Sequence, residues 1–172
     1  YGGRASTCKR WMEKTPEIRS ANVVRILRQH LTVTAMKIKS VKIKNFRGYR
    51  DEMRVDFDDL TVLIGKNDIG KSTILEALDI FFNETSGVVK WDKSDLNVQS
   101  AEKGENEAII SVCFTELPAN IIIDSTVQTD LGSEYMINAD KNLEVIKKFK
   151  TQKPAVFIKA LHPTNPECSD YC

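Results

Sequence analysis

The sequence has few residues that could form a metal site or disulfide bonds. Its four cysteines make no Cys-x-x-Cys pair, and only two histidines accompany them (Cys8, Cys113, Cys168 and Cys172; His30 and His162). This spacing argues against zinc and favours reduced thiols. Cys113 alternates with apolar residues, so we expect its side chain to be buried or half-buried.

Long apolar runs are also missing. No run reaches the length of about 18 residues that crosses a bilayer, and the N-terminal residues lack the apolar block of a signal peptide. The 172 residues are 41% hydrophobic and 28% charged, a composition typical of a globular domain with its own core. We therefore expect no membrane segment and a cytoplasmic location.

Recognisable catalytic sets are missing in the same way. No Ser/His/Asp set, acid and base carboxylate pair or metal-ligand cluster can be placed from spacing. The acidic residues of the polar stretch 84–106 are interpreted as solubilising charges of a loop, with Trp91 as its packing anchor (Asp92, Asp95, Glu102 and Glu105).

Charge is unevenly distributed, although the whole chain carries only +1. Residues 1–35 hold seven basic and two acidic side chains, a net +5, whereas residues 36–172 hold 18 basic and 22 acidic ones, a net −4. A basic arm for nucleic acid and a solvated helix face both explain this asymmetry. Thr15-Pro16-Glu17 predicts a helix start, and Met36 marks a boundary. We divide the chain into a basic extension, 1–35, and a domain, 36–172.

The sequence does contain a phosphate-loop pattern, GKNDIGKST, at residues 65–73. The spacing Gly-x-x-x-x-Gly-Lys-[Ser/Thr] is met by Gly65, Gly70, Lys71 and Ser72. Glycines let successive N–H groups converge on an anion, and a following helix N-terminus favours phosphate. Lys71 can reach the β- and γ-phosphates, and the Ser72 hydroxyl can ligate Mg²⁺. The pattern predicts nucleotide binding, with a plain strand-to-helix turn as the alternative.

The flanks of this loop show the periodicities of regular structure. Residues 60–64 are apolar on both faces, which predicts a strand covered on two sides. Apolar residues recur at helical spacing over 74–82. A hairpin is predicted to pair residues 135–137 with 143–146 around a turn at 138–142. Further strands are predicted over 41–43, 53–57, 108–114, 120–123 and 156–161.

These residues together resemble a known group of ATPases. An opening strand ending Asn45-Phe46-Arg47-Gly48-Tyr49, a short second strand, and LTVLIGKNDIGKSTILEALDIFF resemble the N-terminal ATPase lobe of OLD-family nucleases, RecF and SMC-like proteins. The later stretches KWDKSD, EYMIN and HPTNPECSD look most like the OLD family. The resemblance covers residue 36 onward, and residues 1–35 resemble nothing in it.

The resemblance implies an α/β fold of the P-loop NTPase class, with an ABC-ATPase-like lobe. In this lobe a mixed sheet surrounds the Walker A helix and an antiparallel β layer flanks it. ATP and Mg²⁺ would be bound by the loop, with Ser72 on the metal (Gly65, Asn67, Gly70, Lys71, Ser72 and Thr73). Arg47 would approach the phosphates, with a solvent-facing arginine as the alternative. Action on DNA and a homodimer are implied for a complete protein.

The chain also departs from the family's pattern. Hydrolysis in such ATPases needs an apolar strand ending in Asp-Glu, yet Ser125 follows Asp124 after the apolar run 121–123, so we interpret this run as an ordinary strand end. Neither a signature motif nor an acidic Toprim nuclease part is found. We expect the N-terminal portion of a longer protein that hydrolyses ATP slowly or not at all. A RecF- or SMC-like repair or scaffold ATPase and a non-enzymatic nucleotide-binding remnant are the alternatives.

Overall fold

The computed structural model describes residues 36–65, 70–84, 86–124 and 127–161. The basic extension 1–35, Asn67 and the stretch 162–172 lie outside these residues. Among the described helices, none has the length and hydrophobicity required to span a bilayer. The elements follow in the order β1 (Lys37–Lys44), β2 (Met53–Asp56), α3 (Lys71–Asn83), the 3-10 helix η1 (Lys93–Asp95), α4 (Val98–Glu102), β3 (Ala108–Thr115), β4 (Ile121–Asp124), β5 (Val127–Thr129), β6 (Leu143–Phe149) and β7 (Ala155–Lys159).

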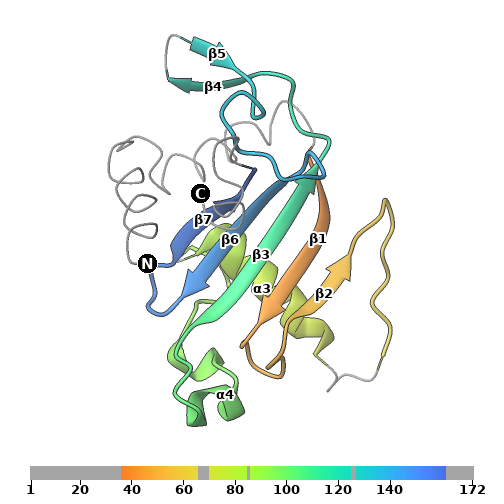
Figure 1. Ribbon diagram of the computed structural model, residues 1–172. Coiled ribbons are helices and arrows are strands. Elements are labelled where there is room, and N and C mark those ends of the chain that lie inside the picture. Colours follow the sequence, from red (N-terminus) through yellow and green to blue (C-terminus); the bar gives the residue numbers. More distant parts are fainter. Residues whose placement is uncertain (1–35, 66–69, 85, 125–126, 162–172) are drawn as a thin grey trace. The chain divides into compact units, whose positions relative to one another are not determined.

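Five strands form one sheet in the order β2-β1-β3-β6-β7, and β4 and β5 form a separate antiparallel pair. β1 pairs with β2 antiparallel, placing Val41 opposite Val55. Figure 1 shows that β1, β3 and β6 run in alternating directions. Strands predicted at β1, β2, β3, β4, β6 and β7 are therefore confirmed. β5 is a strand that the sequence pattern did not indicate.

The chain divides into two compact units, and the first contains the phosphate-loop helix. This helix unit comprises residues 38–113 and 145–156. In it, α3 lies across one face of the strands (Figure 1), with one side buried through Ile74, Ala77, Ile80 and Phe81. The helix predicted over 74–82 is confirmed. Trp91 is 4% exposed, between Phe46 and Phe149, which confirms it as a packing anchor.

The hairpin unit contains β4 and β5, and its described residues are 36–37, 114–124, 127–144 and 157–161. Here the predicted strand 135–137 is wrong, because residues 131–135 form a turn. Asp130 accepts hydrogen bonds from the N–H groups of Gly132 and Ser133, an alternative to a strand ladder. The turn after it exists, since the Asn138 side chain accepts from the N–H groups at 140 and 142.

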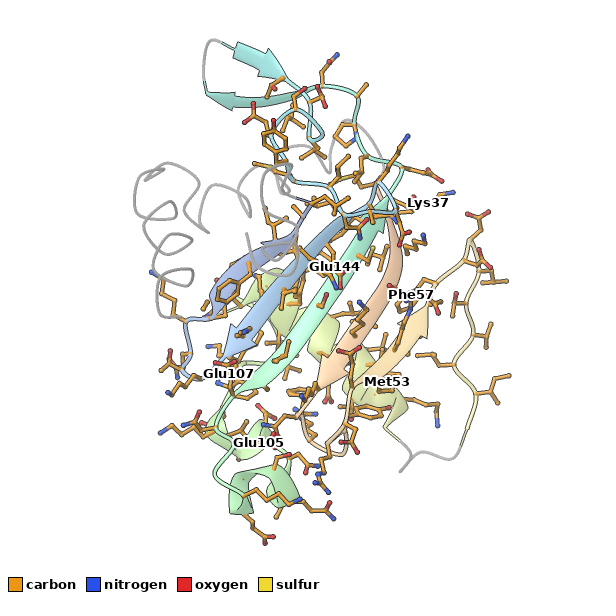
Figure 2. All side chains as sticks on the ribbon, in the orientation of Figure 1. Lys37, Met53, Phe57, Glu105, Glu107 and Glu144 are labelled. Atoms are coloured by element: carbon orange, nitrogen blue, oxygen red, sulfur yellow. The ribbon has the colours of Figure 1, made fainter. Side chains whose placement is uncertain are left out.

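The predicted buried strand over residues 60–64 is also wrong. This segment is not a strand, and Leu60, Val62 and Ile64 are 84%, 66% and 89% exposed. Figure 2 shows the side chains after Phe57 standing clear of the sheet. A run that is apolar on both faces becomes a strand only when neighbouring strands form hydrogen bonds with its backbone N–H and carbonyl groups. Among the described residues, no strand pairs with this segment.

The polar stretch 84–106 is more ordered than the predicted loop. It contains η1 and α4, each with a side-chain cap at its N-terminus. Asp92 and Asp95 form a reciprocal capping box around η1, in which each carboxylate accepts from a backbone N–H. Asp95 is only 8% exposed, so its interpretation as a solubilising surface charge is wrong.

Candidate functional site

The site is built at the start of α3, where the glycine loop enters the helix. Gly70 is the N-cap residue and has φ 79°, a left-handed conformation that favours glycine. Its carbonyl accepts the N–H of Ile74 at 3.3 Å, the first turn of the helix. This geometry aims the first-turn N–H groups away from the helix body, where a helix binds anions.

The Lys71 ammonium contacts the first glycine of the motif. Its Nζ donates a hydrogen bond to the carbonyl oxygen of Gly65, so the side chain reaches back from α3 to that residue. A Cβ added at Gly65 would lie 3.7 Å from that nitrogen, an ordinary contact. The two ends of the motif, six residues apart, are thus joined by the lysine that the motif supplies.

The remaining loop residues are only partly described. Ser72 is exposed in the first turn of α3 and Thr73 is half-buried, so a hydroxyl oxygen is accessible beside the lysine. Asn67 lies outside the described residues. Binding by these residues stays a prediction. Among the described residues, no group of three or more His, Cys, Asp or Glu side chains forms a candidate metal centre.

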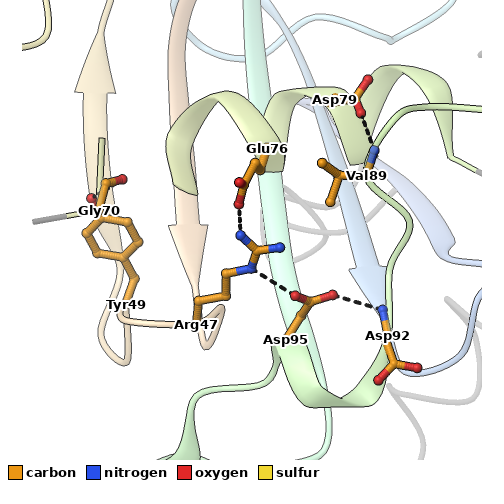
Figure 3. A network of polar contacts seen from close by, with 8 residues as sticks. All are labelled: Arg47, Tyr49, Gly70, Glu76, Asp79, Val89, Asp92 and Asp95. Atoms are coloured by element: carbon orange, nitrogen blue, oxygen red, sulfur yellow. Dashed lines mark hydrogen bonds and ion pairs between the residues drawn. The ribbon is translucent and has the colours of Figure 1, made fainter. Parts of the chain in front are cut away.

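Arg47 lies in the turn between β1 and β2, and its guanidinium forms two ion pairs. One is with Glu76 on the second turn of α3, and the other is with Asp95, at 2.8 Å between Nε and Oδ1 (Figure 3). The arginine side chain is 32% exposed and its Cζ lies 5.2 Å from the Phe46 ring centroid. Arg47 therefore joins the turn between β1 and β2 to α3 and to η1. Its approach to phosphate stays a prediction.

Two neighbouring aspartates have lowered pKa values because their charged forms accept hydrogen bonds. The pKa of Asp79 lies below its ordinary value of 3.8, first because the carboxylate accepts the backbone N–H of Val89 (Figure 3). The second cause is a hydrogen bond that the carboxylate accepts from the Asn83 side chain. The pKa of Asp92 is lowered mainly by the backbone N–H of Ser94. Both carboxylates are thus ionised anchors of the segments that follow α3.

The far end of α3 is held by a buried lysine. Lys147 on β6 is 1% exposed, and its Nζ donates to the Phe81 carbonyl at 2.7 Å and to Glu84 Oε1 at 2.6 Å. A cation near the last carbonyls of a helix is favoured by the helix dipole. The helix that follows the phosphate loop is consequently fixed at both ends.

Sequence reasoning missed several of these residues. The sequence analysis gives no role to Glu76 or to Lys147, which follows the strand predicted over 143–146, and it interprets Asp95 as a loop charge. Their partners lie 29 to 66 positions away, so no local spacing indicates them. Tyr49 was quoted within the strand-end motif, but no signal assigned it a contact with the loop.

The Gly-x-x-x-x-Gly-Lys-Ser pattern at the start of a helix, with its lysine bonded to the carbonyl of its first glycine, is typical of a P-loop nucleoside triphosphatase lobe. Residues 36–172 match the family model of the AAA ATPase domain, and the chain belongs to this family. The predicted α/β P-loop fold class is confirmed by this membership, and the resemblance to RecF and OLD-family proteins is confirmed by the relatives that follow.

Several curated relatives match part of this chain. The DNA replication and repair protein RecF of Lactococcus lactis subsp. lactis (strain IL1403) is 26% identical over 126 residues, covering 65% of this chain and 35% of that protein. Endonuclease GajA of Bacillus cereus (strain VD045) is 27% identical over 105 residues, covering 61% of this chain and 18% of that protein. The match spans about a third or less of either relative's length. A solved structure from a study of ATP-driven dimerization and DNA-stimulated activation of SMC ATPases has a TM-score of 0.48 at 15% identity, covering 77% of this chain and 75% of that chain.

Proposed function

We propose that this chain binds ATP with Mg²⁺ through the loop at residues 65–73. The observation that carries the proposal is the Lys71 ammonium, folded onto the Gly65 carbonyl at the mouth of a loop with the phosphate-binding spacing. An anion entering the loop would offer this ammonium a charged acceptor. Charge-assisted hydrogen bonds are about twice as strong as neutral ones, so phosphate is the favoured partner.

The donor set also fits a magnesium-bound triphosphate. Backbone N–H groups at the helix start and Lys71 would bind phosphate oxygens, and Ser72 would supply a hydroxyl oxygen to the metal. When bound, Mg²⁺ neutralises charge on the phosphates. Gly70 would keep the backbone close to the anion because it has no side chain at that point.

In the complete protein we propose action on DNA, as an OLD-like ATPase that dimerises. Support comes from the AAA ATPase domain and from relatives named as an endonuclease and a DNA replication and repair protein. A RecF-like repair ATPase is the second candidate, because the RecF match extends over 126 residues against 105 for GajA. Titrating labelled duplex DNA with and without ATP tests whether the chain binds DNA at all. With the complete protein, cleavage of that DNA favours the endonuclease, and binding without cleavage favours the RecF-like function.

We further propose that this chain alone hydrolyses ATP slowly. Ser125 follows Asp124 after the apolar run of β4. A serine hydroxyl does not polarise an attacking water as a carboxylate does, and phosphoryl transfer depends on such positioning and charge stabilisation. Robust Mg²⁺-dependent phosphate release by the purified chain, abolished by Lys71→Ala, would contradict this proposal.

Arg47 is proposed to contribute to phosphate binding by exchanging a carboxylate partner for a phosphate oxygen. Its ion pairs with Glu76 and Asp95 hold it beside the phosphate helix. Under this proposal Arg47→Ala weakens ATP binding, whereas Glu76→Gln, which releases the arginine, preserves or strengthens it. Equal weakening by both variants would assign Arg47 to helix support alone.

The experiment that tests nucleotide binding is calorimetric titration of the full chain with Mg-ATP. Lys71→Ala should abolish measurable binding, and Ser72→Ala should remove the dependence on Mg²⁺. Lys90→Ala is the matched control, because it removes an exposed lysine from the loop after α3. Binding that survives Lys71→Ala, or no ATP-dependent thermal stabilisation of the wild type, would refute the proposal and favour a non-enzymatic remnant.

A further inference from the structure

The turn that joins β1 to β2 is a rigid support. Its backbone closes through Asn45 N–H to Arg50 carbonyl and Phe46 N–H to Tyr49 carbonyl, at 3.1 and 2.9 Å. The Asn45 side chain donates to the Glu107 carbonyl at 2.8 Å, and Phe46 is completely buried. A tight turn anchored in this way has little freedom to yield when another segment presses on it.

This turn touches the end of the phosphate loop through Tyr49. The tyrosine hydroxyl donates a hydrogen bond to the Gly70 carbonyl at 3.2 Å (Figure 3). A Cβ at position 70 would lie 2.7 Å from that hydroxyl oxygen and 3.0 Å from the ring carbon bearing it. Gly70 thus serves two purposes: it adopts φ 79°, and it leaves room for the tyrosine.

Holding the Gly70 carbonyl also orients the next N–H group. The peptide unit is planar and trans, so the Gly70 carbonyl and the Lys71 N–H point in opposite directions. Fixing the direction of the Gly70 carbonyl therefore fixes the direction of the Lys71 N–H. The Lys71 N–H belongs to the first turn of α3, whose N–H groups are the ones a helix offers to phosphate.

We propose that Tyr49 is a positioning residue of the phosphate loop. It sets the orientation of the peptide between Gly70 and Lys71 before a nucleotide arrives, without touching the base. The ion pair of Arg47 with Glu76 ties the same turn to the second turn of α3, so the support contacts the helix at two levels. This inference rests on the proposed nucleotide binding and adds a residue outside the motif to it.

The test compares Tyr49→Phe and Tyr49→Ala with wild type in the full chain. Each protein is titrated with Mg-ATP and with tripolyphosphate, which has no base. The titrations are run at a low temperature at which circular dichroism shows that every variant is folded. Loss of a neutral hydrogen bond predicts about three- to tenfold weaker binding of both ligands for Tyr49→Phe. Tyr49→Ala should lose at least as much. Tyr135→Phe removes the same hydroxyl from a tyrosine that is 51% exposed, and should leave both affinities unchanged.

The outcomes separate this inference from the proposed function. If wild type binds neither ligand, the proposed function fails. If it binds and Tyr49→Phe stays within about twofold for both ligands, the positioning role is overturned. Weaker ATP binding with unchanged tripolyphosphate binding would mean that Tyr49 contacts the base, which also overturns it. The positioning role is also overturned if the affinity loss of Tyr49→Phe disappears after correction for the unfolded fraction of the variant.

Discussion

Replacing either partner of the ion pair between Lys147 and Glu84 tests how α3 is held at its far end. The Lys147 side chain is 2% exposed and that of Glu84 is 31% exposed. Besides the carboxylate, the ammonium contacts the Phe81 carbonyl and lies 4.9 Å from the Phe81 ring centroid. The two substitutions Lys147→Met and Glu84→Gln therefore leave different groups without their partner.

Lys147→Met removes the buried charge and leaves the Phe81 carbonyl and the Glu84 carboxylate without the ammonium. Hydrogen bonds involving a charged group contribute about 1.5–3 kcal/mol each. Part of that loss is offset, because methionine retains apolar bulk and no ammonium must be desolvated. Water can also reach the partly exposed Glu84. We expect a loss of about 1–2 kcal/mol in the free energy of unfolding.

Glu84→Gln should cost more, because it replaces the carboxylate that pairs with the buried ammonium by a neutral amide. Removing one partner of a buried pair typically costs about 3–5 kcal/mol. The partial exposure of Glu84 reduces this, so we expect about 2–4 kcal/mol. Adding Glu84→Gln to Lys147→Met should then cost almost nothing, since no buried charge remains to lose its partner.

Urea unfolding followed by circular dichroism measures all three variants. The matched control is Lys148→Met, one residue along β6, where Nζ lies 3.9 Å from Glu107 Oε1 and the lysine side chain is 22% exposed. That variant should lose no more than about 0.5–1 kcal/mol. Glu84→Gln costing less than Lys147→Met, or a double mutant whose loss equals the sum of the single losses, would refute the reasoning.

Three further predictions concern the core, the loop and pH. Phe46→Ala should lower the free energy of unfolding by about 3–5 kcal/mol, whereas Val62→Ser at an exposed site should change it by less than about 0.5 kcal/mol; similar losses in urea melts would contradict the described burial. Gly70→Ala and Gly104→Ala share a positive φ and a strain of about 1–2 kcal/mol, but Gly70→Ala adds a steric contact, so its thermal midpoint should be the lower of the two. The pKa of Asp79 is lowered in the folded chain, so the unfolded chain takes up the proton first as pH falls below 3.8, and stability is lost there. Asp79→Asn should therefore show a shallower decline of the thermal midpoint between about pH 5 and 2. An unchanged profile would count against Asp79 as an anchor.

The elements that the sequence predicted correctly are those whose pattern is local. The 3.6-residue period of 74–82 predicted α3, and alternation predicted β1 and most other strands of the sheet. Residues 60–64 and 135–137 failed because a strand depends on a neighbour that periodicity does not name. At 130–138 local side-chain bonds offered the backbone an alternative to the ladder.

The sequence by itself determined the Gly-x-x-x-x-Gly-Lys-Ser pattern, with its glycines and its lysine, because these residues lie within nine consecutive positions. Only the tertiary structure decided what surrounds them. Arg47 meets Glu76 and Asp95, and Tyr49 meets Gly70, from positions 21 to 48 residues apart. Such contacts depend on how the strand turn is packed against α3, which is a long-range property of the fold. The residues of the motif are therefore set by local spacing, and the rigidity of their support is set by packing.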